Sequence, residues 1–62
     1  MVITQEEALL IVIMVGAYFS HQGFIVSDNP TAEGLGEVKL LRRIAKEFPS
    51  LQSHVDLVLS GG

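Results

Sequence analysis

The sequence feature that most constrains the fold is a long apolar run, ALLIVIMVGAYF, at residues 8–19. These twelve consecutive positions carry no charged or amide side chain, in a chain of only 62 residues. Ile11, Val12, Ile13 and Val15 are β-branched, so a buried strand is one interpretation. Strands are usually about 4 to 8 residues long, however, and the length of the run therefore favours a helix.

Residues on both sides of the run are typical of helix ends. Thr4 and Glu7 have the spacing of a capping box, in which each side chain accepts a hydrogen bond from the backbone amide of the other residue. At the other end, His21 suits the negative end of the helix dipole, and Gly23 can adopt the left-handed conformation that terminates helices. We therefore predict a helix at about residues 5–22.

This helix would be apolar on every side, and such a helix must be buried on every side. Two shorter helices in the same chain would cover only part of it, so a second copy of the chain, another protein or lipid must cover the rest. We expect homo-oligomerisation, most simply as a dimer, because two-fold dimers are the commonest closed assemblies. A chain of 62 residues without cysteine also lacks disulfides as a means of supporting a small core.

The predicted oligomer interface is a shallow ridge of smaller residues, four positions apart, along this helix. Interdigitation of such ridges is the commonest mode of helix packing, and Gly16 would allow two helix axes to approach closely. Alternatively, Gly16 makes room for Phe24 or Phe48 within one subunit. The ridge consists of Ala8, Val12, Gly16 and Ser20.

Lipid is a weaker candidate for covering this helix. A membrane-spanning helix needs about 20 apolar residues, whereas Glu6, Glu7, His21 and Gln22 lie close to the ends of this run. The positively charged segment that starts a signal peptide is missing as well. We therefore expect a cytoplasmic protein and retain a small membrane-associated protein as an alternative.

The remainder of the chain predicts two further helices. Asn29 as the N-cap and Pro30 at the first helical position indicate the start of a second helix, with Thr31 as an alternative N-cap. A proline ends this helix, and Ser50 caps a third. The predicted fold is therefore all-α, with one domain over residues 1–62 and a central hydrophobic first helix. The second and third helices are predicted at about residues 30–48 and 50–60.

A basic face on the second predicted helix is the most regular polar pattern, with spacings of i, i+3, i+4 and i+7. Like charges at these spacings repel each other by roughly 0.2–0.5 kcal/mol per pair. Glu6, Glu7 or Glu47 could act as counter-ions, as could an acidic protein, a nucleotide or another phosphate ligand. A solvated face without a specific ligand is the alternative. The basic face consists of Lys39, Arg42, Arg43 and Lys46.

Composition and spacing disfavour several function classes. The formal net charge of −3 and the few aromatic residues argue against nucleic-acid binding. His21 and His54 without cysteine form an incomplete metal site, and Ser53, His54 and Asp56 do not face one another on a helix. We predict no catalytic residue, no cofactor and no metal.

The sequence thus predicts a small non-enzymatic protein-interaction module, such as an adaptor, an inhibitor or an assembly subunit. It would self-associate through its first helix and present the basic face to an acidic partner protein. An oligomeric binder of an anionic nucleotide or another phosphate ligand is the alternative from a different class.

Overall fold

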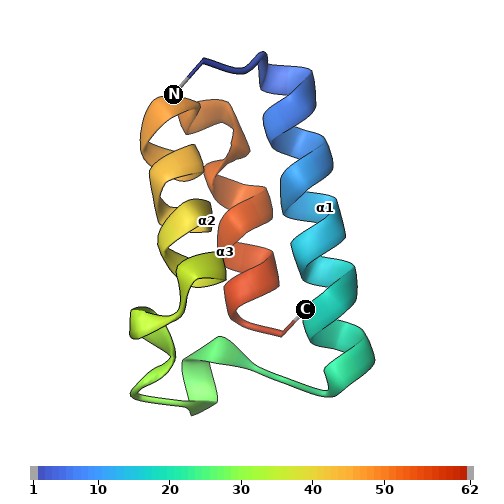
Figure 1. Cartoon of the computed structure of the whole chain (residues 1–62), viewed down its shortest axis with the longest axis vertical. Coiled ribbons are helices and arrows are strands. Elements are labelled where there is room, and N and C mark those ends of the chain that lie inside the picture. Colours follow the sequence, from blue (N-terminus) through green and yellow to red (C-terminus); the bar gives the residue numbers. More distant parts are fainter. Residues whose placement is uncertain (1, 62) are drawn as a thin grey trace.

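Three α-helices form a bundle in the computed structural model, which describes residues 2–61 (Figure 1). The long axis of the bundle measures 29 Å. An 18-residue helix is about 27 Å long, so α1 spans the whole molecule. No strand occurs in the described part of the chain, and the predicted all-α three-helix fold is confirmed. The elements are α1 (Gln5–Gln22), the 3-10 turns η1 (Val26–Asp28) and η2 (Ala32–Gly34), α2 (Gly36–Glu47), the 3-10 turn η3 (Pro49–Leu51) and α3 (Gln52–Leu59).

α1 has the predicted bounds because residues at both ends satisfy backbone groups that a helix leaves unpaired. At the N-terminal end, Thr4 Oγ1 accepts a hydrogen bond from the Glu7 N–H at 3.1 Å, and Glu7 Oε1 accepts one from the Thr4 N–H at 2.9 Å. At the C-terminal end, Gly23 has a φ of 66°, and the Phe24 N–H donates to the Phe19 carbonyl. The left-handed conformation at position 23 is one that glycine adopts without steric cost.

α2 begins later than predicted, at Gly36 rather than at residue 30. The Asn29 side chain, predicted as the N-cap, instead donates a hydrogen bond from Nδ2 to the Ile25 carbonyl at 2.7 Å. Thr31 makes no side-chain capping bond either. The segment before α2 forms only the turn η2, because Gly34 and Gly36 lower its helix propensity.

α3 begins after a turn rather than directly at the predicted cap. Ser50 lies inside η3, which starts at Pro49, and α3 follows from Gln52 without a side-chain cap. Proline fixes the φ angle of the first turn residue and has no N–H to donate, and a tight 3-10 turn accommodates both properties. The chain reverses direction here, so that α2 runs antiparallel to α1 and α3 (Figure 1).

The hydrophobic core lies where the three helices meet. α1 packs mainly against α3, and α2 packs against α3 and the neighbouring turns. Each helix contributes one apolar face, and each of the three turns adds one buried side chain. The buried residues are Ala8, Val12, Phe19, Val26, Ala32, Val38, Leu41, Ile44, Leu51, Val55 and Leu59.

The ridge predicted as an oligomer interface is covered within the chain instead. Ala8 and Val12 are fully buried in the core, Gly16 faces Val58 of α3, and only Ser20 is exposed. A Cβ atom added at Gly16 would lie 2.9 Å from Val58 Cγ2, so the glycine allows a close approach of α1 and α3. Gly16 thus makes room for a side chain of the same subunit, as the alternative interpretation proposed. That side chain is Val58 rather than Phe24 or Phe48. Three of the four ridge residues therefore face the core or α3 of the same chain.

Candidate functional site

Most of the large exposed apolar side chains lie on α1, on the side that faces away from the core. Leu10, Ile13, Met14 and Tyr18 are 57%, 55%, 61% and 53% exposed, respectively. Their spacing, with the exposed Ala17 between them, places all five residues on one helix face. We call this face the outward stripe, and it consists of Leu10, Ile13, Met14, Ala17 and Tyr18.

The outward stripe lies opposite the buried face of the same helix. Met14 follows the buried Val12 by two residues, and at about 100° per residue this places Met14 on the far side of α1. Leu10 and Tyr18, four residues before and after Met14, share its side. α1 is therefore apolar on two opposite faces, of which its own chain covers only one.

Polar residues border the outward stripe at both of its ends. Glu6 and Glu7 lie in the first turn of α1, and His21 and Gln22 lie in its last turn, all of them exposed. An apolar centre with a polar rim is the usual anatomy of a protein interface. Four large side chains that are each more than half exposed form a patch on the order of 400 Å², a size at which patches on monomers are often functional.

Reasoning from the sequence placed the uncovered face of α1 on the wrong side. The apolar run correctly indicated a helix that its own chain cannot cover on every side, but an unbroken run does not reveal which side faces inward. The sizes of the side chains indicate which side of α1 faces inward. Small residues such as Ala8 and Gly16 permit the close approach of a neighbouring helix, whereas bulky residues such as Met14 and Tyr18 are left outside.

The basic face lies on the outward side of α2, and Lys39, Arg42, Arg43 and Lys46 are all exposed. Arg42, Arg43 and Lys46 border an open hollow together with Glu47. Within residues 2–61, Arg42 is the only member of the basic face that forms an ion pair. The face therefore presents three further cations to solvent.

The counter-ion of Arg42 is Glu33, which was not among the predicted counter-ions. Arg42 Nε and Nη2 donate to the two Glu33 carboxylate oxygens at 3.2 and 2.8 Å. The hydrogen bond from Arg42 lowers the pKa of the Glu33 carboxyl below its ordinary value, and the same bond raises the pKa of Arg42. The pair joins η2 to α2 across nine positions of sequence, a separation at which helix periodicity gives no indication of contact.

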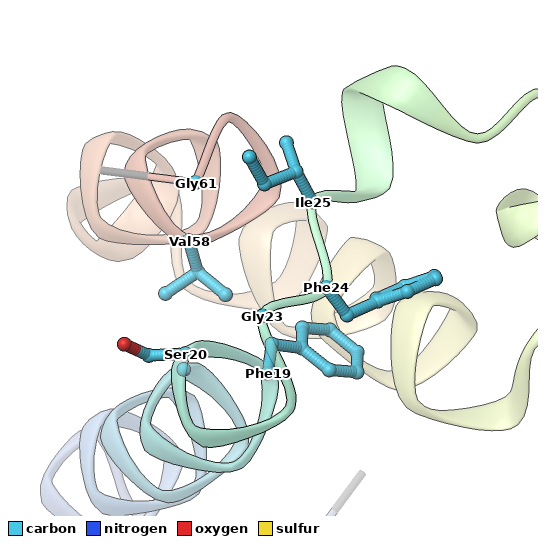
Figure 2. A pocket seen from close by; sticks show the side chains of 8 residues that line it. Phe19, Ser20, Gly23, Phe24, Ile25, Val58 and Gly61 are labelled. Carbon is cyan, nitrogen blue, oxygen red and sulfur yellow. The ribbon is translucent and has the colours of Figure 1, made fainter.

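A pocket of about 340 Å³ lies between the C-terminal ends of α1 and α3 (Figure 2). The Phe19 and Phe24 rings meet here at a centroid distance of 5.2 Å, and Val58 extends toward α1. The hydroxyl of Ser20 is the only polar side-chain group among the lining residues, and none of these side chains is an acid, a base or a metal ligand. The pocket can accept an apolar group but supplies no group for acid–base chemistry. Its lining consists of Gly16, Phe19, Ser20, Gly23, Phe24, Ile25, Val58 and Gly61.

The two histidines do not belong to a metal-binding cluster. Over the described residues, no group of three or more histidine, aspartate or glutamate side chains is placed to hold a metal ion. No helix in residues 2–61 combines the length and the apolar content that crossing a membrane requires. Comparison of the chain with protein families, with curated proteins and with solved structures finds no match.

Proposed function

We propose that this protein is a small non-enzymatic interaction module, an adaptor, inhibitor or assembly subunit, that self-associates through the outward stripe of α1. One observation carries the proposal. Leu10, Ile13, Met14 and Tyr18 are each more than half exposed, although they belong to a helix whose opposite face packs into the core. Apolar side chains gain free energy when they leave water, so this face is stabilised by any surface that covers it.

A second copy of the chain is the first partner that we propose. Every copy carries the same outward stripe, and a two-fold axis would bring two identical stripes into contact as a closed dimer. The contact would fall at the low end of specific interfaces in area, where weak and transient complexes are found. The basic face is on a different helix, and a dimer through α1 would leave it free for an acidic partner.

The experiment that tests this proposal compares two leucines with nearly equal exposure. Leu10, in the outward stripe, is 57% exposed, and Leu57, on α3, is 55% exposed. We expect sedimentation equilibrium to show a wild-type dimer that Leu10→Lys weakens roughly 100-fold, because each dimer loses two buried leucines and gains two buried charges. Leu57→Lys is the matched control and should leave the dimer intact.

Two results would contradict the proposal. One is a wild-type chain that stays monomeric up to millimolar concentration. The other is an equal loss of association in the Leu10→Lys and Leu57→Lys variants, which would indicate a general effect of added charge. Circular dichroism of both variants checks that each of them is folded.

The basic face supports a second candidate function, the binding of an anionic nucleotide or another phosphate ligand. The supporting observation is the open hollow beside Arg43 and Lys46, since paired guanidinium donors suit phosphate oxygens. Native mass spectrometry in low and high salt tests this candidate. We expect extra mass that is lost in high salt and in an Arg43→Glu, Lys46→Glu variant. The candidate is wrong if the wild-type chain carries no added mass after incubation with ATP or inorganic phosphate.

A further inference from the structure

We infer that two copies of this chain pair through antiparallel α1 helices, with the two-fold axis at Met14 and with Leu10 of each copy against Tyr18 of the other. This inference rests on the self-association proposed above and specifies its geometry. The partner is a second copy, and the contact is made by the outward stripe of each.

Two large residues of the outward stripe and two polar residues at its ends are arranged symmetrically about Met14. Leu10 and Tyr18 lie four residues before and after it, and Glu7 and His21 lie seven residues before and after it. Displacements of four and seven residues keep these side chains near one helix face. Met14 is also the most exposed of the four large side chains in the stripe, at 61%. An axis at Met14 would therefore bring Leu10 of one copy to Tyr18 of the other, and Glu7 of one copy to His21 of the other.

The charges at the two ends of the stripe favour the antiparallel arrangement. In this arrangement, the acidic first turn with Glu6 and Glu7 would lie beside the partner's His21, whose ring N–H can donate to a carboxylate. Glu7 Oε1 is used by the capping box, but its second carboxylate oxygen and the exposed Glu6 have no such role. A parallel pair would place acidic turns side by side and align the two helix dipoles, and both effects are repulsive.

The sizes of the side chains favour the same arrangement. Leu10 would pack against the partner's Tyr18, and the small Ala17 beside that tyrosine would leave room for the leucine. A parallel pair would instead oppose Ala17 with Ala17 and Tyr18 with Tyr18. The two alanines would leave a void between the helices, and the two tyrosines would crowd each other. Protein interfaces are instead packed as densely as protein interiors.

Disulfide cross-linking distinguishes the two arrangements, and the chain is suited to it because it has no cysteine of its own. Leu10→Cys and Tyr18→Cys proteins are mixed in equal amounts and oxidised. We expect the mixed disulfide to exceed either homodisulfide at least about five-fold. In an antiparallel pair, equivalent residues at position 10 would be separated by roughly 12 Å along the axis, which a disulfide cannot bridge.

Two single-cysteine proteins serve as controls. Met14→Cys lies at the proposed axis and should form a homodisulfide, whereas Leu57→Cys, outside the stripe, should form none. Homodisulfides at positions 10 and 18 without the mixed product would overturn the antiparallel geometry and leave the dimer itself in place. A wild-type monomer would overturn the proposed function as well, and a dimer without a disulfide at position 14 would place the interface elsewhere.

A charge exchange provides a second, independent measurement. His21→Glu should weaken the dimer roughly five-fold at low salt, because it places a carboxylate beside the partner's acidic turn in both symmetric contacts. Adding Glu6→Lys should restore most of the lost affinity. Restoration requires the two ends of α1 to meet, so a double variant that stays as weak as His21→Glu would overturn the antiparallel arrangement.

Discussion

α1 and α2 contribute similar apolar faces to the core, but their outward faces differ in chemical character. Opposite Val38, Leu41 and Ile44, α2 presents the basic face to solvent. Opposite its own buried face, α1 presents the outward stripe. The difference shows that the exposed side of α2 is well hydrated, whereas a single chain covers only one of the two apolar faces of α1.

The two outward faces also differ in how they interact with their surroundings. Lysine and arginine keep their charged ends in water while their stems lie along apolar surface, so the outward side of α2 is stable without a partner. The outward stripe of α1 has no charged side chain between its first and last turns, and its only polar side-chain group is the Tyr18 hydroxyl. The same helical geometry thus produces one charged face compatible with solvent and one apolar face that the chain leaves exposed.

The largest effect that we expect is on stability, and it distinguishes a buried isoleucine from an exposed one. Ile44 of α2 is fully buried and Ile13 of α1 is 55% exposed, so the same truncation can be made at both positions. Ile44→Ala should lower the free energy of unfolding by about 2–5 kcal/mol, and Ile13→Ala should lower it by less than about 1 kcal/mol. Urea denaturation, at concentrations below dimer formation, measures both values.

Equal losses in these two variants would refute the contrast between the faces. Because a domain of this size has only about 3–9 kcal/mol of stability, the Ile44→Ala variant can be partly unfolded already in buffer. Ile44→Val is a milder change at the same site, and it should give a smaller loss in the same direction.

A second effect concerns the contact between α1 and α3 at Gly16. Gly16→Leu should lower the free energy of unfolding by roughly 1–3 kcal/mol, because its Cβ alone would lie 2.9 Å from Val58 Cγ2. Thermal denaturation gives the loss for the single variant and for Gly16→Leu combined with Val58→Ala. The combination should be the more stable of the two, and an unchanged melting temperature of the single variant would refute the close contact.

The smallest effect concerns the ion pair on the outward side of α2. The pKa of Glu33 is lowered in the folded chain by the hydrogen bond from Arg42, so the pair stabilises the fold above the ordinary glutamate pKa of 4.5. This contribution disappears as the pH falls through the lowered pKa and the carboxylate becomes protonated. Glu33→Gln should therefore reduce the melting temperature slightly at pH 7 and not at strongly acidic pH.

The comparison at the two pH values contains its own control, since both proteins are measured under both conditions. Exposed ion pairs are weak and are screened by salt, so the difference at pH 7 should shrink in 1 M salt. A difference that persists at acidic pH would mean that the Glu33→Gln substitution disturbs η2 for a reason other than charge.

The bounds of α1 could be predicted from the sequence because the determining interactions are local. Thr4 and Glu7 are three residues apart, and Gly23 ends the helix through its own backbone conformation. The start of α2 could not be predicted in this way. Asn29 has equally good local uses as a cap and as a donor to the Ile25 carbonyl, and packing of the connecting turns decides between them.

The candidate site was predictable only in part. A continuous apolar run indicates that a helix needs cover on every side, but it contains no periodicity from which the inward side can be read. The contact of Gly16 with Val58 and that of Arg42 with Glu33 depend on how segments distant in sequence come together. The basic face, in contrast, was found from spacing alone, since charges at helical intervals on an exposed side follow directly from the pattern.

The parallel arrangement of α1 and α3 has a consequence for the order of folding. Gly16 and Val58 are far apart in the sequence, so their contact closes a long loop, while α2, η3 and α3 are neighbours along the chain. Contacts between neighbours form faster than contacts that close long loops. We therefore expect α2 and α3 to assemble first and α1 to dock last, so that both apolar faces of α1 are briefly open to other chains during folding.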